Sequence, residues 1–181
     1  MLERPGIRNN GDGTFAEVAA EAGAPLMVPR VSRGAAFGDL FNDGHIDVVI
    51  NNLDGKPTIL RNDGGDHNNW ITLKMVGAGK NPDALGTRVK VAAGDMVEWD
   101  EVRSGGSYLS SSDLRLHFGL ARRTRVDLIE VHWPDGKVET VKDVLPNHFL
   151  TIQYGKGVVE TVPPRSNTPD MRKKNPEGPA R

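Results

Sequence analysis

The sequence predicts an almost all-β protein. Short runs in which alternate residues are apolar recur along the chain, and this pattern is typical of half-buried strands. In "WITLKMV", for example, Ile71, Leu73 and Met75 fall on one face of such a strand. The turn-forming segment "WPDGK" (133–137) separates two further runs and predicts a tight hairpin. Only "FAEVAAEAG" (15–23) has a helical pattern, so strands account for nearly all of the expected structure.

An internal repeat opens the chain. "IRNNGDG" (7–13) recurs as "LRNDGGD" (60–66), so that Arg8 and Arg61 take equivalent positions. Both copies place Asn, Asp and Gly after an apolar-Arg pair, which is the chemistry of hairpin turns. Because a period of about 50 residues is the size of a propeller blade, the repeat predicts blade-like units in the first third of the chain.

The other strands follow in order. "IDVVINN" (46–52) is a β-branched run that ends in Asn, and "RVKV" (88–91), "LRLHFGL" (114–120) and "LTIQY" (150–154) alternate. From residue 157 the chain becomes rich in Pro and polar residues with little to bury. This composition predicts a disordered tail over 157–181.

Composition excludes several classes of function. A net charge of −1 gives no overall attraction to nucleic acid or anionic lipid, and without cysteines there are no disulfides or thiolate metal sites. No run approaches the roughly 20 apolar residues of a membrane helix. The N-terminus "MLERPGIRNN" lacks the features of a signal peptide, so if the protein is exported, its signal is expected upstream of this segment.

An acidic loop precedes the run "VVINN". Asp39, Asp43 and Asp47 occupy positions one, five and nine, and Gly44 permits a sharp turn. Carboxylates at alternate positions of a tight loop can converge on calcium, which takes 6–8 oxygen ligands. Position seven is His45, which would offer its backbone carbonyl. The spacing therefore predicts a calcium loop.

Two residues depart from that pattern. Position three is Phe41 rather than a carboxylate, and position twelve is Ile50 rather than the Glu of an EF-hand. The loop also leads into a strand rather than a helix, which excludes an EF-hand. The alternative is that the three Asp residues only cap and solvate a tight turn.

Several motifs together resemble known families. "GDLFNDGHIDVVINN" resembles the FG-GAP/VCBS repeat, an integrin-like propeller motif, and "RNNGDGTFAEVAAEAG" resembles the hairpin between such blades. "DALGTRVKV", "VRSGGSYLSSSDLRLHFGL" and "VDLIEVHWPDGKVETV" resemble the ASPIC/UnbV domain of bacterial proteins related to the animal cartilage acidic protein. Ser111, where Gln is expected, is a small departure.

The resemblance implies a domain organisation. Residues 1–65 would be a fragment of an FG-GAP/VCBS propeller, 66–156 a β-sandwich-like ASPIC/UnbV domain, and 157–181 the tail. One and a half blades would leave an edge and an apolar flank open. Residues 36–59 are therefore expected to exchange amide hydrogens faster than the sandwich strands, unless the blade docks on the sandwich or on another copy.

Carried over by position, the resemblance implies a calcium site built from Asp39, Asp43, the His45 carbonyl and Asp47. Phe41 removes one of the four carboxylates. Because affinity in such loops depends on charge count and rigidity, calcium is expected to bind weakly, at the millimolar end of the range, or not at all.

No other constellation indicates chemistry. The five histidines show no metal-binding spacing, and neither a nucleophile elbow nor a phosphate loop is present, so no catalytic residue is predicted. At least two of Trp70, Trp99 and Trp133 are expected to be packed, and an exposed one would offer a stacking surface for a sugar or a peptide.

The leading functional hypothesis is a non-enzymatic binding or adhesion module of a secreted or envelope protein. Its ligand would be a protein or glycan, with no nucleic acid or membrane span, and it would form part of a longer propeller chain. The alternative is an accessory or enzymatic component of natural-product biosynthesis, because UnbV-type proteins resemble partners that are encoded with natural-product pathways. A third possibility is a purely structural domain of a larger assembly.

Overall fold

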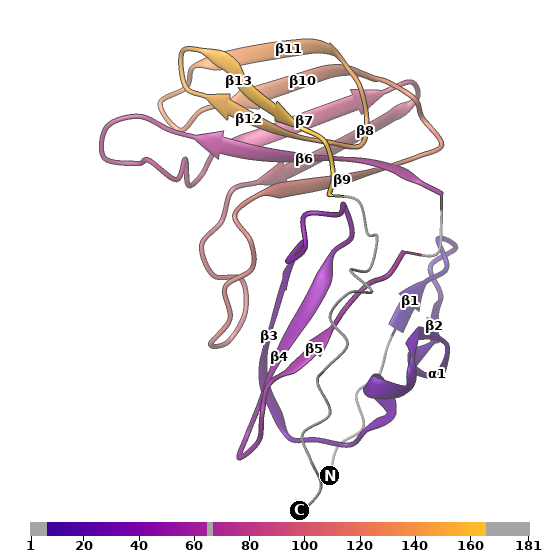
Figure 1. The fold of residues 1–181 in the computed structure, drawn as a ribbon. Coiled ribbons are helices and arrows are strands. Elements are labelled where there is room, and N and C mark those ends of the chain that lie inside the picture. Colours follow the sequence, from indigo (N-terminus) through magenta and orange to yellow (C-terminus); the bar gives the residue numbers. More distant parts are fainter. Residues whose placement is uncertain (1–6, 65–66, 166–181) are drawn as a thin grey trace, which may run out of the picture.

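The computed structural model describes residues 7–64 and 67–165 and consists almost entirely of strands (Figure 1). The elements are β1 (Ile7–Asn9), β2 (Phe15–Glu17), α1 (Ala19–Ala22), the 3-10 helix η1 (Ala24–Met27), β3 (Ser32–Gly38), β4 (Asp47–Asn52), β5 (Thr58–Leu60), β6 (Asn69–Val76), β7 (Arg88–Ala93), β8 (Met96–Glu101), β9 (Leu116–Ala121), β10 (Val126–His132), β11 (Val138–Val144), β12 (His148–Gln153) and β13 (Gly157–Val162). The predicted all-β class is confirmed. Within these residues no helix is long and apolar enough to cross a membrane.

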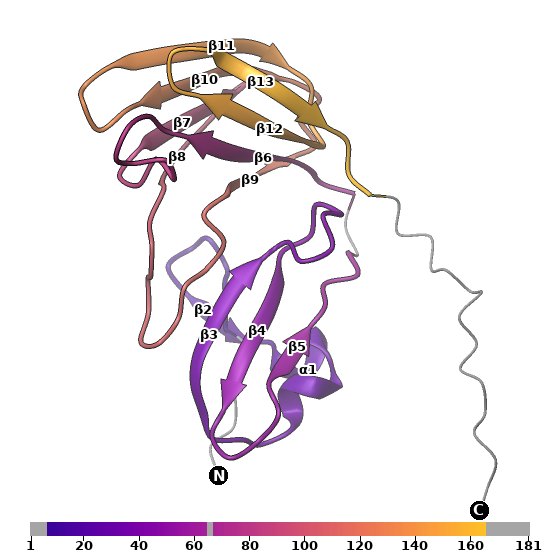
Figure 2. The ribbon, with the colours of Figure 1, turned by 60° about the vertical axis from the view of Figure 1, so that its left-hand side comes forward.

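Two four-stranded sheets, in the orders β11-β10-β7-β8 and β13-β12-β6-β9, form a β-sandwich (Figures 1 and 2). All neighbours are antiparallel except β6 and β12, which run parallel. The inward-facing residues of both sheets make one core, as the alternation predicts, with Ile71, Val89 and Ile129 fully buried. The "WPDGK" hairpin joins β10 to β11, and the Trp133 N–H donates to the Lys137 carbonyl (2.8 Å).

The N-terminal part consists of the hairpin β1-β2 and the three-stranded antiparallel sheet β3-β4-β5. Both copies of the repeat end a strand with the same local turn. Gly11 N–H donates to Asn9 Oδ1 (2.9 Å), and Gly64 N–H donates to Asn62 Oδ1 (3.0 Å). Both glycines have positive φ (81° and 75°), which favours Gly. The two copies of the repeat thus share this local turn.

The second copy of the repeat does not form a hairpin within the described residues. The first copy joins β1 to β2, whereas β5 pairs only with β4, and the chain continues to β6 in the sandwich. An Asx turn is local, but a hairpin also needs a returning strand. Residues 65–66 of this copy lie outside the described residues. Assignment of β3-β4-β5 to a propeller blade stays a prediction.

The predicted helix over 15–23 is mostly wrong. Residues 15–17 pair with β1, and the helix is confined to Ala19–Ala22. Nine residues are too few to be stable as an isolated helix, so pairing with β1 determines the strand conformation of residues 15–17.

The prediction of a disordered tail from residue 157 is wrong for its first part. Gly157–Val162 forms β13, an edge strand antiparallel to β12. Its sequence "GVVETV" contains three valines, which favour strand, and the Pro-rich composition begins only after it. The sandwich therefore extends to Val162 rather than ending at 156. Residues 166–181 lie outside the described residues.

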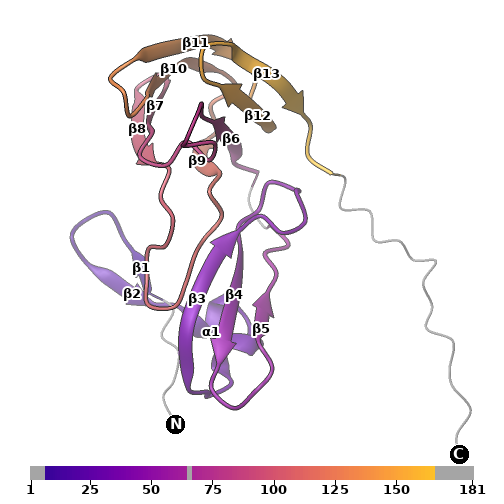
Figure 3. The same cartoon turned by 90° about the vertical axis from the view of Figure 1, so that its left-hand side faces the viewer.

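The β8–β9 loop (residues 102–115) leaves the sandwich and runs along the free edge of β3 (Figures 2 and 3). The Asp113 N–H donates to the Phe37 carbonyl (2.9 Å), and the Phe37 N–H donates to Ser112 Oγ (3.2 Å). A Cβ on Gly34 would lie 2.5 Å from Ser110 Oγ, so the two backbones are in close contact. This loop covers an edge that would otherwise be open to aggregation and connects the two parts of the chain.

Candidate functional site

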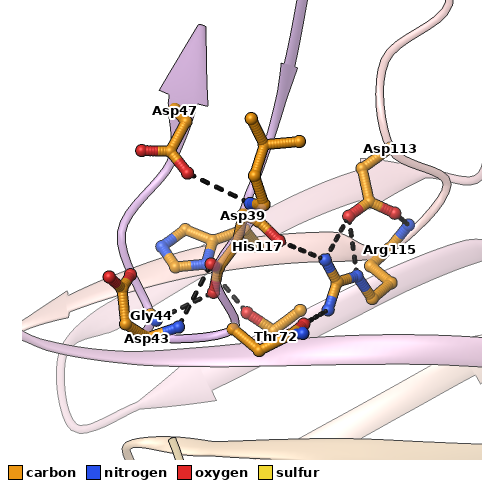
Figure 4. Close-up of polar contacts among 10 residues, drawn as sticks. Asp39, Asp43, Gly44, Asp47, Thr72, Asp113, Arg115 and His117 are labelled. Carbon is orange, nitrogen blue, oxygen red and sulfur yellow. Dashed lines mark hydrogen bonds and ion pairs between the residues drawn. The ribbon is translucent and has the colours of Figure 1, made fainter. Parts of the chain in front are cut away.

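The acidic loop lies between β3 and β4, at the end of the three-stranded sheet nearest the sandwich (Figures 1 and 4). Its three carboxylates are buried: Asp39, Asp43 and Asp47. Asp39 accepts hydrogen bonds from two backbone N–H groups, from Asp43 to Oδ1 (3.1 Å) and from Gly44 to Oδ2 (2.8 Å). Asp39 therefore closes the turn as a capping residue does.

The other two carboxylates also accept backbone donors. Asp47 binds the Leu40 N–H through Oδ2 (3.1 Å) and the Asn62 N–H through Oδ1 (2.8 Å), so it connects the loop to the segment after β5. Asp43 Oδ1 accepts from the His45 N–H (3.1 Å). A buried carboxylate needs such donors because its desolvation is otherwise costly.

The residues present do not fit a calcium ion well. Among residues 7–64 and 67–165, no group of three or more His, Cys, Asp or Glu side chains is arranged to hold a metal. The third position holds the ring of Phe41, and the Arg61 guanidinium carbon lies 4.6 Å from its centroid. Arg61 Nη2 is also 3.9 Å from Asp43 Oδ2. The predicted ligands share one loop but do not form a ligand cluster, and calcium binding stays a prediction.

The loop packs on the outer side of β6. Gly44 has φ of +92°, and a Cβ there would lie 2.1–2.3 Å from three atoms of the Trp70 indole. Only glycine permits both this conformation and this approach. Trp70 and Thr72 alternate with core residues and point outward, yet both are buried because the loop lies over them.

We name this outer surface of β6, β9 and β12 the covered face; it comprises Trp70, Thr72, His117 and Phe149. Thr72 is paired with His117 on one side and Phe149 on the other. The Trp70 and His117 rings are stacked at 5.7 Å and 21°. The covered face is thus an aromatic surface with one hydroxyl and one imidazole.

His117 is held as a neutral imidazole at neutral pH. Its Nδ1 lies 2.8 Å from Thr72 Oγ1. Burial lowers the pKa of His117 below its usual value; the negative charge of Asp39 opposes this, while His45 and Arg115 add to it. Desolvation by partial burial of the ring is the largest of these effects.

Arg115 fixes the loop from the sandwich side (Figure 4). Its guanidinium donates to the Asp39 carbonyl (2.8 Å) and to Asn42 Oδ1 (2.7 Å). It also forms an ion pair with Asp113 (2.6 Å). One planar fork therefore joins the end of the β8–β9 loop to the acidic loop, a role that lysine geometry does not reproduce.

A cavity of about 620 Å³ lies beside the loop, between the two parts. Its polar lining includes His45, His117, Asn62 and Asn69. Among the described lining residues there is no carboxylate, hydroxyl or amine that could pair with an imidazole in acid–base or nucleophilic chemistry.

The outer surface of the other sheet is exposed, and we name it the open face: Arg88, Lys90, Trp99, Glu130 and His132. Trp99 retains 47% of its accessible surface. Its ring lies 5.2 Å from the Arg88 guanidinium carbon, 5.7 Å from Lys90 Nζ and 5.2 Å from the His132 ring, which is tilted by 54°. Glu130 Oε1 lies 2.5 Å from His132 Nε2, and the hydrogen bond between them lowers the pKa of Glu130.

The tryptophans follow the sequence prediction in part. Trp133 is buried in the sandwich core, and Trp70 is buried beneath the loop, so two of the three are packed as expected. Trp99 is the exposed one. Arg115 and the covered face were not predicted, since no local pattern shows which outward residues another segment will cover.

These features define an all-β chain with a two-sheet β-domain and a smaller three-stranded sheet. The acidic loop of the smaller sheet packs against the β-domain. Residues 77–159 match the family described as ASPIC and UnbV, which confirms that part of the resemblance. The match begins after β6, although β6 lies between β12 and β9 in the second sheet. No curated protein matches the chain. No support is found for FG-GAP/VCBS repeats or for the cartilage acidic protein family, so both stay predictions.

Proposed function

We propose that this chain is a non-enzymatic recognition module that binds its ligand on the open face. The exposed Trp99 ring carries this proposal. Large aromatic residues and Arg are enriched where binding energy concentrates, and here Trp99 has Arg88 beside it. The contacts with Arg88, Lys90 and His132 restrict the ring, so little conformational entropy is lost when a ligand stacks on it.

The chemistry of the open face favours a glycan over a protein. A pyranose ring presents an apolar C–H surface to Trp99 and hydroxyls to the flanking groups. Lys90 offers donors and Glu130 offers acceptors, and both are placed directly across from one another in neighbouring strands. A protein ligand would instead be centred on the exposed apolar side chains of this surface, Val97 and Val138, rather than on its charged groups.

A glycan array probed with the labelled chain tests this proposal. We expect binding to at least one class of glycan, reduced by tenfold or more in Trp99→Ala. Tyr108→Ala is the matched control, because Tyr108 is an exposed aromatic on the β8–β9 loop, away from the open face. Equal binding by wild type and Trp99→Ala, or no glycan bound by wild type, would reject the glycan proposal.

The alternative, an accessory or enzymatic role in natural-product biosynthesis, is favoured by one observation. The cavity beside the acidic loop holds two imidazoles, and one of them, His117, is neutral. A small polar product or intermediate could bind there. Protection of the His45 ring against modification on adding candidate small molecules would support this alternative over the open face.

We further propose that β3-β4-β5 is a blade of the FG-GAP/VCBS type in a longer secreted or envelope protein. Phe37 and Ile59 lie on opposite faces of this sheet, because they pair with the consecutive residues Val48 and Val49 of β4. Both side chains are more than half exposed. A sheet with exposed apolar residues on both faces suits a position between two neighbours. A longer chain that includes the upstream residues should bind less hydrophobic dye per molecule, and equal dye binding would count against the blade.

A further inference from the structure

We propose that Arg61 supplies the positive charge that a bound cation would otherwise provide to the acidic loop. The loop then keeps its conformation, and its contact with the covered face, without calcium. This inference concerns the loop and does not depend on the proposed ligand of the open face.

The first observation is the pairing of Phe41 with Arg61. Phe41 takes the position at which a calcium loop carries a carboxylate, and its side chain has no oxygen to offer a metal. Its ring instead lies 4.6 Å from the Arg61 guanidinium carbon. An aromatic face attracts a cation electrostatically, and arginine is the cation most often found there.

The second observation is the set of carboxylates around the same guanidinium. Arg61 Nε lies 2.9 Å from Asp63 Oδ1, and Arg61 Nη2 lies 3.9 Å from Asp43 Oδ2. Asp43 is buried, so an unbalanced negative charge there would be costly. Arg61 therefore balances the negative charge of Asp43, which stands at position five of the loop.

The third observation is that the organising contacts of the loop are made by the backbone. Both oxygens of Asp39 and both oxygens of Asp47 accept backbone N–H groups. In a calcium loop the ion draws these side chains together. Here amide donors hold them, and Arg115 holds the Asp39 carbonyl from the sandwich side.

The repeat provides an internal comparison for Arg61. Arg8 stands at the equivalent position of the first copy, before the same Asx turn. Its guanidinium is 3.8 Å from Glu21, and both side chains are largely exposed. The same repeat position therefore carries an exposed ion pair in one copy and a contact with a buried carboxylate in the other.

Thermal unfolding in excess calcium and in chelator tests the proposal, with Arg8→Ala as the matched control. We expect the Tm of the wild type to differ by less than about 1 °C between the two conditions, since a ligand that does not bind cannot stabilise. Arg61→Ala should lower Tm by about 3–6 °C in chelator, as expected for the loss of 1–2 kcal/mol in a chain of this size. Arg8→Ala should lower it by less than about 1 °C.

A gain-of-binding variant measured in calcium keeps the proposal falsifiable if Arg61→Ala does not fold, because its added carboxylate lets calcium replace the lost positive charge. Phe41→Asp combined with Arg61→Ala adds a carboxylate and removes the competing cation, so isothermal titration should show calcium binding in the millimolar range. Wild type titrated in parallel should give no binding heat. Calcium binding by the wild type, or an Arg61→Ala variant as stable as Arg8→Ala, would overturn the proposal.

Discussion

The two outer faces of the sandwich each carry a tryptophan next to a histidine, but in opposite environments. On the covered face, Trp70 and His117 are stacked at 21° beneath the acidic loop. On the open face, Trp99 and His132 are tilted at 54°, and nearly half of the Trp99 surface is accessible. The same residue types therefore join two parts of the chain on one side and remain available to a ligand on the other.

The two faces differ because the backbone of another segment packs against only the covered face. Gly44 lets the acidic loop reach the Trp70 ring, and Arg115 fixes the loop by its carbonyl and amide oxygens. On the open face the charged side chains of Arg88 and Lys90 lie against Trp99 instead. Aromatic surface covered by backbone contributes to stability, whereas aromatic surface beside charged groups contributes to recognition.

The largest expected effect comes from removing each tryptophan in turn. Trp70→Ala should lower the free energy of unfolding by about 3–5 kcal/mol, because it removes a large packed side chain. Trp99→Ala should lower it by less than about 1 kcal/mol, the scale of an exposed cation–π contact. Urea denaturation followed by circular dichroism measures both, and similar losses would mean that the open face is as structural as the covered one.

Gly44→Ala tests the close approach itself. The added methyl group would overlap the Trp70 ring, so we expect a loss of about 3 kcal/mol or more from overpacking together with the positive φ. Gly13→Ala is the control, since Gly13 has a similar φ (+87°) with nothing within 4 Å of the added atom. The difference between the two variants reports the clash alone, and equal losses would show that Trp70 moves away freely.

Arg115→Ala should lower the free energy of unfolding by about 2 kcal/mol, because it leaves the Asp39 carbonyl and the Asn42 amide without their partner. Arg103→Ala should cost less than about 0.5 kcal/mol, since the Arg103 pair with Asp100 is exposed. Lysine at position 115 should recover only part of the loss. Full recovery by Arg115→Lys would show that charge, rather than the planar fork, matters.

The smallest effect is a pH dependence from His117. Its folded pKa lies below the unfolded value of about 6.5, so between the two the unfolded chain binds a proton that the folded chain does not. Stability should therefore fall as the pH drops below about 6.5 and stop falling below the folded pKa. His117→Gln should flatten this slope in pH-dependent urea titrations. A slope unchanged in His117→Gln would contradict the burial of the neutral ring.

The sequence predicted the sandwich well because its signals are local. Alternation placed Ile71, Leu73 and Met75 in the core, and the turn chemistry of 133–137 located a hairpin. These patterns need only neighbouring residues. The family resemblance of residues 77–159 was confirmed for the same region.

The sequence failed where distant segments meet. Alternation puts Trp70 and Thr72 on the outside of β6, and nothing nearby indicates that a loop some thirty residues earlier covers them. The acidic residues predicted a metal loop, but the structure shows backbone donors on Asp39 and Asp47 and Arg61 beside Asp43. Such contacts depend on tertiary packing, which local pattern does not encode.

We expect docking of the acidic loop on the covered face to make the three-stranded sheet and the sandwich one cooperative unit, which native-state hydrogen exchange can measure. In a proven monomer, amides of β3 and β4 should open with the same free energy as those of β9 and β12, within about 1 kcal/mol. Gly44→Ala should selectively lower the free energy at which the amides of β3 and β4 open. If residues 36–50 of the wild type open at a free energy lower by several kcal/mol than β9 and β12, the two parts unfold independently and the acidic loop does not couple them.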